Sequence, residues 1–138
     1  MDGSASGQRG LVVFLRILGT VDLLAVAAIL LPLEWMAKIH SWLGMGQLPE
    51  MAIISYLTRS ASALYALHGA MILFISTDVR RYARLIKFLA IAALVHGVIF
   101  YLIDMIAGMP PFWIALEGPI VVATGVIVLM MQRRPLAA

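Results

Sequence analysis

Four long apolar stretches, separated by short polar segments, dominate the chain. A helix needs about 20 apolar residues to cross the hydrocarbon core of a bilayer. The stretches that reach this length are 11–33, 51–76, 82–106 and 112–131. Short connections place sequential helices antiparallel to one another. The pattern therefore predicts an all-α integral membrane protein, a four-helix up-down bundle over 11–132, with a disordered leader (1–10) before it and a short tail (133–138) after it.

The segment between the first two stretches predicts one further element. Met36, Ile39, His40 and Leu43 recur at helical spacing and form one stripe. Trp35 and Trp42 carry amphipathic rings, which favour the headgroup zone of a membrane. We expect a short helix that lies in the outer interface and is closed by Gly44 and Gly46.

Composition agrees with a membrane protein. The 138 residues are 63% hydrophobic and 12% charged, with a mean hydropathy of +1.02, whereas soluble domains are about half apolar and a quarter charged. The absence of cysteine excludes disulfides, thiolate metal sites and cysteine nucleophiles. The first stretch lacks an Ala-x-Ala-like cleavage site, so we interpret it as a retained span.

The cations predict the topology. Most of them form three clusters, which are Arg9 and Arg16, then Arg80, Arg81, Arg84 and Lys87, and finally Arg133 and Arg134. With four spans the three clusters share one side of the membrane, and the other side has Lys38 alone. The positive-inside rule then places both termini in the cytoplasm. This distribution favours a topology signal, with some attraction to anionic lipid, over binding of nucleic acid.

Charged residues within the apolar stretches are the candidates for function. Arg59 lies on a face of small residues that recurs every seven positions, at Ser55, Ser62, Gly69 and Ser76. Small residues line the interfaces of membrane helices, so Arg59 should face protein rather than lipid. At about 1.5 Å of rise per residue, Arg59, Asp104 and Glu117 all lie in the outer half of the bilayer. We predict that Glu117, Asp104 or both hold Arg59, and that the deeper Asp22 is a candidate fourth member.

The balance of charge in this predicted centre points to a ligand. Three carboxyl groups against one guanidinium leave a negative excess, which a proton, a metal ion or an amine-bearing ligand would balance. Pro119 should kink the fourth helix close to Glu117, and broken helices at membrane depth often line a site. The alternatives are a structural ion pair that fixes helix register and an ordinary proline kink.

Other side chains are candidates for the surroundings of this centre. They are Tyr56, Tyr65, Tyr101, Trp113 and Thr124. His68 and His96 could be haem ligands or members of a proton relay. Their heights differ by roughly one turn, which favours packed histidines. The methionines are scattered rather than spaced as metal ligands, and we expect no bound cofactor or metal.

Four segments carry a resemblance to a known group. YLTRSASALYALHG, DVRRY, GMPPFW and EGP together resemble small four-span bacterial membrane proteins of unknown function, similar in size and layout to DoxX-like proteins. The resemblance covers most of the chain from Pro32 onward. It implies a location in the bacterial inner membrane and a loose association with redox or stress-linked partners, and it carries over no catalytic residue.

These observations together predict a function in binding. We expect an integral membrane protein, surrounded by lipid, that binds a small lipophilic or cationic ligand or a membrane protein partner at the polar centre, with a homo-oligomer as a further alternative. Nothing in the pattern calls for catalysis. The alternatives are a structural accessory subunit of a larger membrane complex, a proton-coupled transporter and a b-type haem protein.

Overall fold

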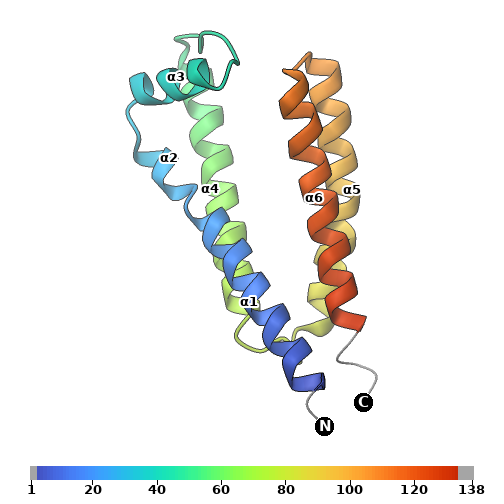
Figure 1. Ribbon diagram of the computed structural model, residues 1–138. Helices are drawn as coiled ribbons and strands as arrows, with labels where there is room; N and C mark the ends of the chain where they lie inside the picture. The colour runs from blue at the N-terminus through green and yellow to red at the C-terminus, as the bar shows by residue number, and fades with distance from the viewer. Residues whose placement is uncertain (1–2, 134–138) are drawn as a thin grey trace. The chain divides into compact units, whose positions relative to one another are not determined.

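The computed structural model describes residues 3–133, and every regular element within them is a helix. The helices are α1 (Gly3–Leu23), α2 (Val26–Leu30), α3 (Leu33–Trp42), α4 (Ala52–Ile75), α5 (Ala83–Ala107) and α6 (Pro111–Arg133) (Figure 1). The all-α prediction is confirmed. Most of the predicted tail, from residue 134 onward, lies outside the described residues.

The described chain divides into two compact units. Unit 1 contains residues 3–14 and 75–133, and so includes α5, α6 and the first part of α1. Unit 2 contains Leu15–Phe74. It includes the rest of α1, all of α2 and α3, and all of α4 except Ile75. The single domain predicted over 11–132 stays a prediction, and each unit is described by itself below.

Three helical segments are long and apolar enough to cross a membrane. They are Gly7–Leu30, which joins α1 to α2, and the helices α5 and α6. Helix α4 has 24 residues, enough to span, but it is not among the three. Arg59, His68 and the serines of α4 lower its hydropathy. The prediction of membrane-spanning helices is therefore supported for three of the four expected segments.

The first predicted span differs from expectation at both ends. Helix α1 begins at Gly3, so the structure has a helix over residues 3–10 where the sequence predicted a disordered leader. The α-helical hydrogen-bond pattern is then interrupted at Leu24 and Ala25 before α2 begins, where the amides of Ala25, Ala27 and Ala28 donate three residues back instead of four. Leu31 adopts an extended conformation (ψ 135°), which the following proline favours because its ring disfavours helical geometry in the preceding residue.

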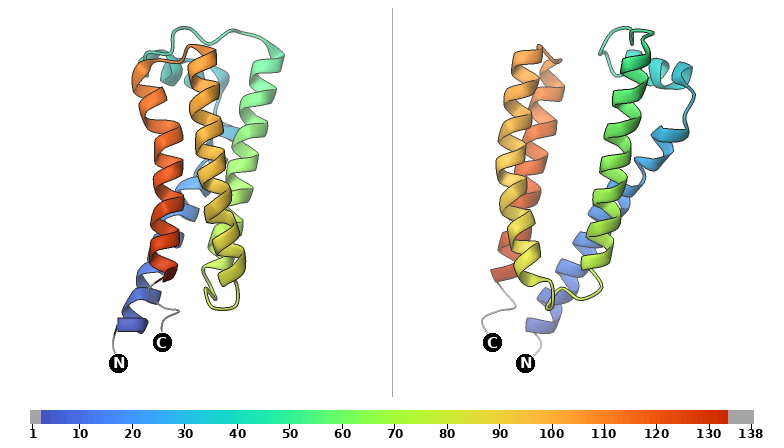
Figure 2. Two further views of the ribbon diagram at one scale, coloured as in Figure 1. Left: turned by 90° about the vertical axis from the view of Figure 1, so that its right-hand side faces the viewer. Right: turned by 180° about the vertical axis from the view of Figure 1, so that it is seen from behind.

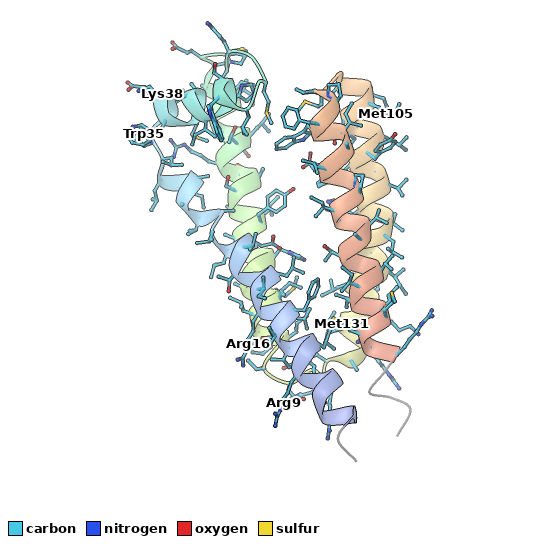
Figure 3. All side chains as sticks on the ribbon, viewed as in Figure 1. Arg9, Arg16, Trp35, Lys38, Met105 and Met131 are labelled. Carbon is cyan, nitrogen blue, oxygen red and sulfur yellow. The ribbon has the colours of Figure 1, made fainter. Side chains whose placement is uncertain are left out.

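Helix α3 confirms the helix predicted between the first two spans. Of the predicted helical stripe, Met36 is buried. Figure 3 labels Trp35 and Lys38, whose side chains project outward from α3. Gly44 and Gly46 end the segment with φ angles of +76° and +83°, a conformation that side chains other than glycine rarely adopt.

In unit 1, α5 and α6 form the predicted antiparallel pair, side by side in Figure 2. Their backbones meet at Gly97 and Gly118, where a Cβ atom added to either residue would lie 2.6 Å from the carbonyl oxygen of the other. Small residues of this kind let membrane helices approach closely. Pro119 lies within α6, as predicted, and α6 begins at Pro111, close to the predicted start at Phe112.

In unit 2, α1 and α4 meet in the same way. A Cβ atom added to Gly19 would lie 2.9 Å from the carbonyl oxygen of Gly69. The predicted face of small residues on α4 is buried at Ser62 and Gly69, whereas Ser76 lies after the end of α4 and belongs to unit 1. The prediction that this face packs on protein is confirmed at Gly69.

Candidate functional site

An acidic pair in unit 1 is the first candidate site. Asp104 lies on α5, seven residues after Gly97 and thus two turns along the same face, and Glu117 lies on α6 directly before Gly118. The close approach of the two glycines therefore brings the two acids together. The two carboxyl groups are near enough to each other for Coulombic interaction.

The two carboxyl groups of this acidic pair differ in their surroundings. Glu117 is half-buried, and its Oε2 accepts a hydrogen bond from the indole Nε1–H of Trp113, one turn earlier on α6. Asp104 is only 6% exposed, and its buried Oδ2 has no hydrogen-bond partner among the described residues. Leaving a buried polar atom unsatisfied costs about 1–3 kcal/mol, and more for a charged group. The acidic pair thus offers an acceptor that the described protein does not use.

The chemistry of the acidic pair favours a hydrogen-bond donor that carries positive charge. Two adjacent carboxyl groups repel each other when both are ionised, and a proton or a cation between them removes the repulsion. Among residues 3–133 no group of three or more His, Cys, Asp or Glu side chains could hold a metal ion. Hard cations such as Ca²⁺ take six or more oxygen ligands, whereas an ammonium group needs only a few acceptors.

Arg59 occupies a second polar site, in unit 2. Its Nη1 donates to the carbonyl oxygen of Ile29, its Nη2 donates to that of Leu31 at 3.0 Å, and its Nε donates to Ser55 Oγ at 3.3 Å. Helix α2 ends at Leu30, so these carbonyl groups lack the helical partners that a continuing helix would supply. A cation at the C-terminus of a helix also interacts favourably with the helix dipole.

These hydrogen bonds explain how the Arg59 guanidinium is held within an apolar helix. The prediction that Arg59 faces protein is confirmed by its three hydrogen bonds within unit 2. The predicted partners Asp104 and Glu117 belong to unit 1, and their pairing with Arg59 stays a prediction. No side chain marks these backbone carbonyls in the sequence, and Pro32, which ends the preceding segment, is the one signal that points to them.

Asp22 and His68 form a third polar site, also in unit 2. His68 Nδ1 lies 2.8 Å from Asp22 Oδ2, and the two side chains are 43% and 19% exposed. The contact between Gly19 and Gly69 explains the pairing, because Asp22 lies one turn after Gly19 and His68 directly precedes Gly69. Both residues are candidates in the sequence, but no sequence pattern predicts their pairing.

The remaining candidates divide into those that join a site and those that do not. Trp113 joins the acidic pair directly, and His96 is near enough to Glu117 for Coulombic interaction. The Thr124 hydroxyl donates to the Ile120 carbonyl oxygen at 2.9 Å, within its own helix. The tyrosines Tyr56, Tyr65 and Tyr101 are exposed. Their predicted role around the polar centre stays a prediction.

The chain matches no protein-family model, no curated protein and no solved structure. The resemblance to DoxX-like proteins therefore stays a prediction. Any functional conclusion depends on the three polar sites and on the apolar helices that carry them.

Proposed function

We propose that this chain is an integral membrane protein that binds a small lipophilic ammonium ion at Asp104 and Glu117. The observation that carries the proposal is the buried Oδ2 of Asp104, which has no hydrogen-bond donor among the described residues. An ammonium N–H would donate to this oxygen, and its positive charge would offset the repulsion between the two carboxyl groups.

The position of the acidic pair decides the character of the ligand. Asp104 lies in α5 and Glu117 in α6, both of which are long and apolar enough to cross a membrane. Both acids lie within about two turns of the connected ends of these helices, so a ligand at the edge of the apolar region, with an ammonium group attached to an apolar body, fits this position. Arg59 already donates three hydrogen bonds within unit 2. We therefore propose that the acidic pair takes its positive charge from the ligand.

The topology that we propose has four spans, with α4 as the fourth. The polar residues that lower the hydropathy of α4 have protein partners, since Arg59 binds backbone carbonyls and His68 binds Asp22. Such residues would not face lipid, and their presence is compatible with a span. Four spans place the three basic clusters on the cytoplasmic side of a bacterial inner membrane, with both termini. They also place α3, with its exposed Trp35 and Trp42, at the outer interface.

Binding of n-octylammonium to the full chain in detergent micelles tests this proposal by isothermal titration calorimetry. We expect saturable binding that weakens about tenfold or more in Asp104→Asn and Glu117→Gln, since a hydrogen bond to a charged group contributes about 1.5–3 kcal/mol. Octyltrimethylammonium carries the same charge without an N–H donor, and we expect it to bind more weakly. Glu34→Gln, at an exposed acid on α3, is the matched control and should bind as the wild type does. Equal affinity across all four proteins would contradict the proposal.

A further inference from the structure

Five of the ten cations of the chain line one hollow in unit 1. The hollow has a volume of about 610 Å³, and the cations are Arg80, Arg81, Arg84, Lys87 and Arg133. No carboxylate is among its lining residues. The hollow lies where α5 begins and α6 ends, far along both helices from the acidic pair.

Helical spacing explains how these side chains come together. On α5, Arg84, Lys87 and Ile91 are separated by three and four residues and so lie on one face. On α6, Leu129 and Arg133 are four residues apart and likewise share a face. The antiparallel pairing of α5 with α6 brings the two faces to the same hollow.

A buried hydrogen bond fixes the two helix ends to each other. Gln132 Nε2 donates to the carbonyl oxygen of Ala83 at 2.9 Å, and Gln132 is itself buried. Ala83 is the first residue of α5, and Gln132 lies one residue before the end of α6. This hydrogen bond therefore holds the start of α5 and the end of α6 together at the hollow, which Ala83 and Gln132 both line.

The positive charge of the hollow is not neutralised by the described protein. None of its five cations forms an ion pair with a carboxylate among residues 3–133. Arg80 Nη2 donates to Gln8 Oε1 at 2.8 Å, and the Arg81 guanidinium lies 5.7 Å from the centre of the Tyr82 ring. Both partners are uncharged. The nearby Asp78 carboxylate accepts the backbone N–H of Arg81 at 3.0 Å, and the first N–H groups of α5 add positive potential.

The lining changes from charged to apolar along the helices. Lys87 lies about one turn into α5, and Ile91 lies one turn further, with Leu129 contributed by α6. In the four-span topology, the charged end faces the cytoplasmic headgroups and the apolar end faces the acyl region. An anion with an apolar tail would match this order, and arginine binds phosphate oxygens through two parallel N–H donors.

We propose that this hollow binds the phosphate headgroup of an anionic phospholipid, with Ile91 and Leu129 in contact with the start of an acyl chain. Basic pockets between membrane helices on the cytoplasmic side are suited to such headgroups. The inference uses no residue of the acidic pair, so it stands or fails separately from the proposed ammonium site.

Native mass spectrometry of the full chain in detergent, titrated with phosphatidylglycerol or phosphatidylcholine, tests the inference. We expect the wild-type protein to retain the anionic lipid in preference to the zwitterionic one. The variant Arg84→Gln/Lys87→Gln should retain about tenfold less of the anionic lipid. Arg9→Gln/Arg16→Gln removes the same charge from exposed positions that do not line the hollow, and should retain the lipid within about twofold of the wild type. Equal loss in both double variants would overturn the inference, because it would show a general charge effect.

Two further measurements test whether the hollow binds lipid. Arg133→Gln, a single change at the exposed end of α6, should weaken retention even if the double variant does not fold, and unchanged retention would count against the hollow. Inorganic phosphate and sn-glycerol 3-phosphate present the same anion without acyl chains. If either displaces phosphatidylglycerol at equal concentration, the hollow is a soluble-phosphate site and the lipid assignment is wrong.

Discussion

Gly97 and Gly118 lie in direct backbone contact, with no space for a side chain between α5 and α6. A Cβ atom on Gly97 would lie 2.6 Å from the Gly118 carbonyl oxygen and 2.9 Å from the backbone nitrogen of Val122. This contact sets the register of the two helices. Since Asp104 and Glu117 are placed by that register, the glycine pair is the structural origin of the acidic pair.

Gly97→Ala should therefore destabilise unit 1. Overpacking a close contact typically costs about 1–3 kcal/mol, and here two of the three nearest obstructing atoms are backbone. The free energy of unfolding in mixed detergent micelles measures this effect. Gly10→Ala is the matched control, because its nearest obstruction is the terminal methyl of Met131 at 3.3 Å, which can move. Similar losses of unfolding free energy in the two variants would show that the close contact of Gly97 with Gly118 does not determine the stability of unit 1.

Arg59→Lys should destabilise unit 2 although it preserves the charge. A lysine ammonium cannot reproduce the planar fork that donates to Ile29 and Leu31 together, and we expect a loss of about 1–3 kcal/mol. Hydrogen exchange of the amides in α2 should become faster, because the end of that helix loses its partner. Arg16→Lys, at an exposed position on α1, should change neither quantity. An Arg59→Lys protein with wild-type exchange in α2 would contradict the carbonyl site.

Asp22 and His68 should be energetically coupled. A double-mutant cycle with Asp22→Asn and His68→Gln should give a coupling of about 0.5–1 kcal/mol, because hydrogen bonds between membrane helices average near 0.6 kcal/mol. The control cycle combines Asp22→Asn with His40→Gln, whose ring contacts the Gly46 carbonyl oxygen instead, and should give none. Coupling of equal size in both cycles would rule out a specific contact.

Single cysteines can test whether α4 crosses the membrane, since the chain has no cysteine of its own. Lys38→Cys lies before α4 and Arg81→Cys after it. In intact bacterial cells, an impermeant maleimide should label Lys38→Cys directly and Arg81→Cys only after permeabilisation. Arg9→Cys should behave as Arg81→Cys does. Labelling of Lys38→Cys and Arg81→Cys from the same side would mean that α4 does not span.

Local features of the fold were predictable because they depend on residues close in sequence. Apolar length predicted α4, α5 and α6 to within about two residues at each end. The short helix α3 followed from the spacing around Met36, and its end from Gly44 and Gly46. The position of Pro119 within α6 followed because a helix starting there would be too short to span.

Features that depend on pairing between distant segments were not predictable. The partners of Arg59 are backbone carbonyls, which have no side-chain signature, and they become available because α2 ends at Leu30 and Leu31 is extended. The pairing of Asp22 with His68 depends on the rotation of α1 relative to α4. Charge alone favoured carboxylate partners for Arg59, and no sequence pattern ranked them against carbonyl groups.

The fluorescence of Trp113 tests the ammonium site most directly, because its indole N–H donates to Glu117. Replacing Trp35 and Trp42 by Phe leaves Trp113 as the single tryptophan of the chain. Titration of this protein with n-octylammonium should then give a saturable change in emission, and Asp104→Asn in the same background should abolish it. A flat titration of the parent protein, or an unaltered curve in the Asp104→Asn protein, would contradict binding at the acidic pair.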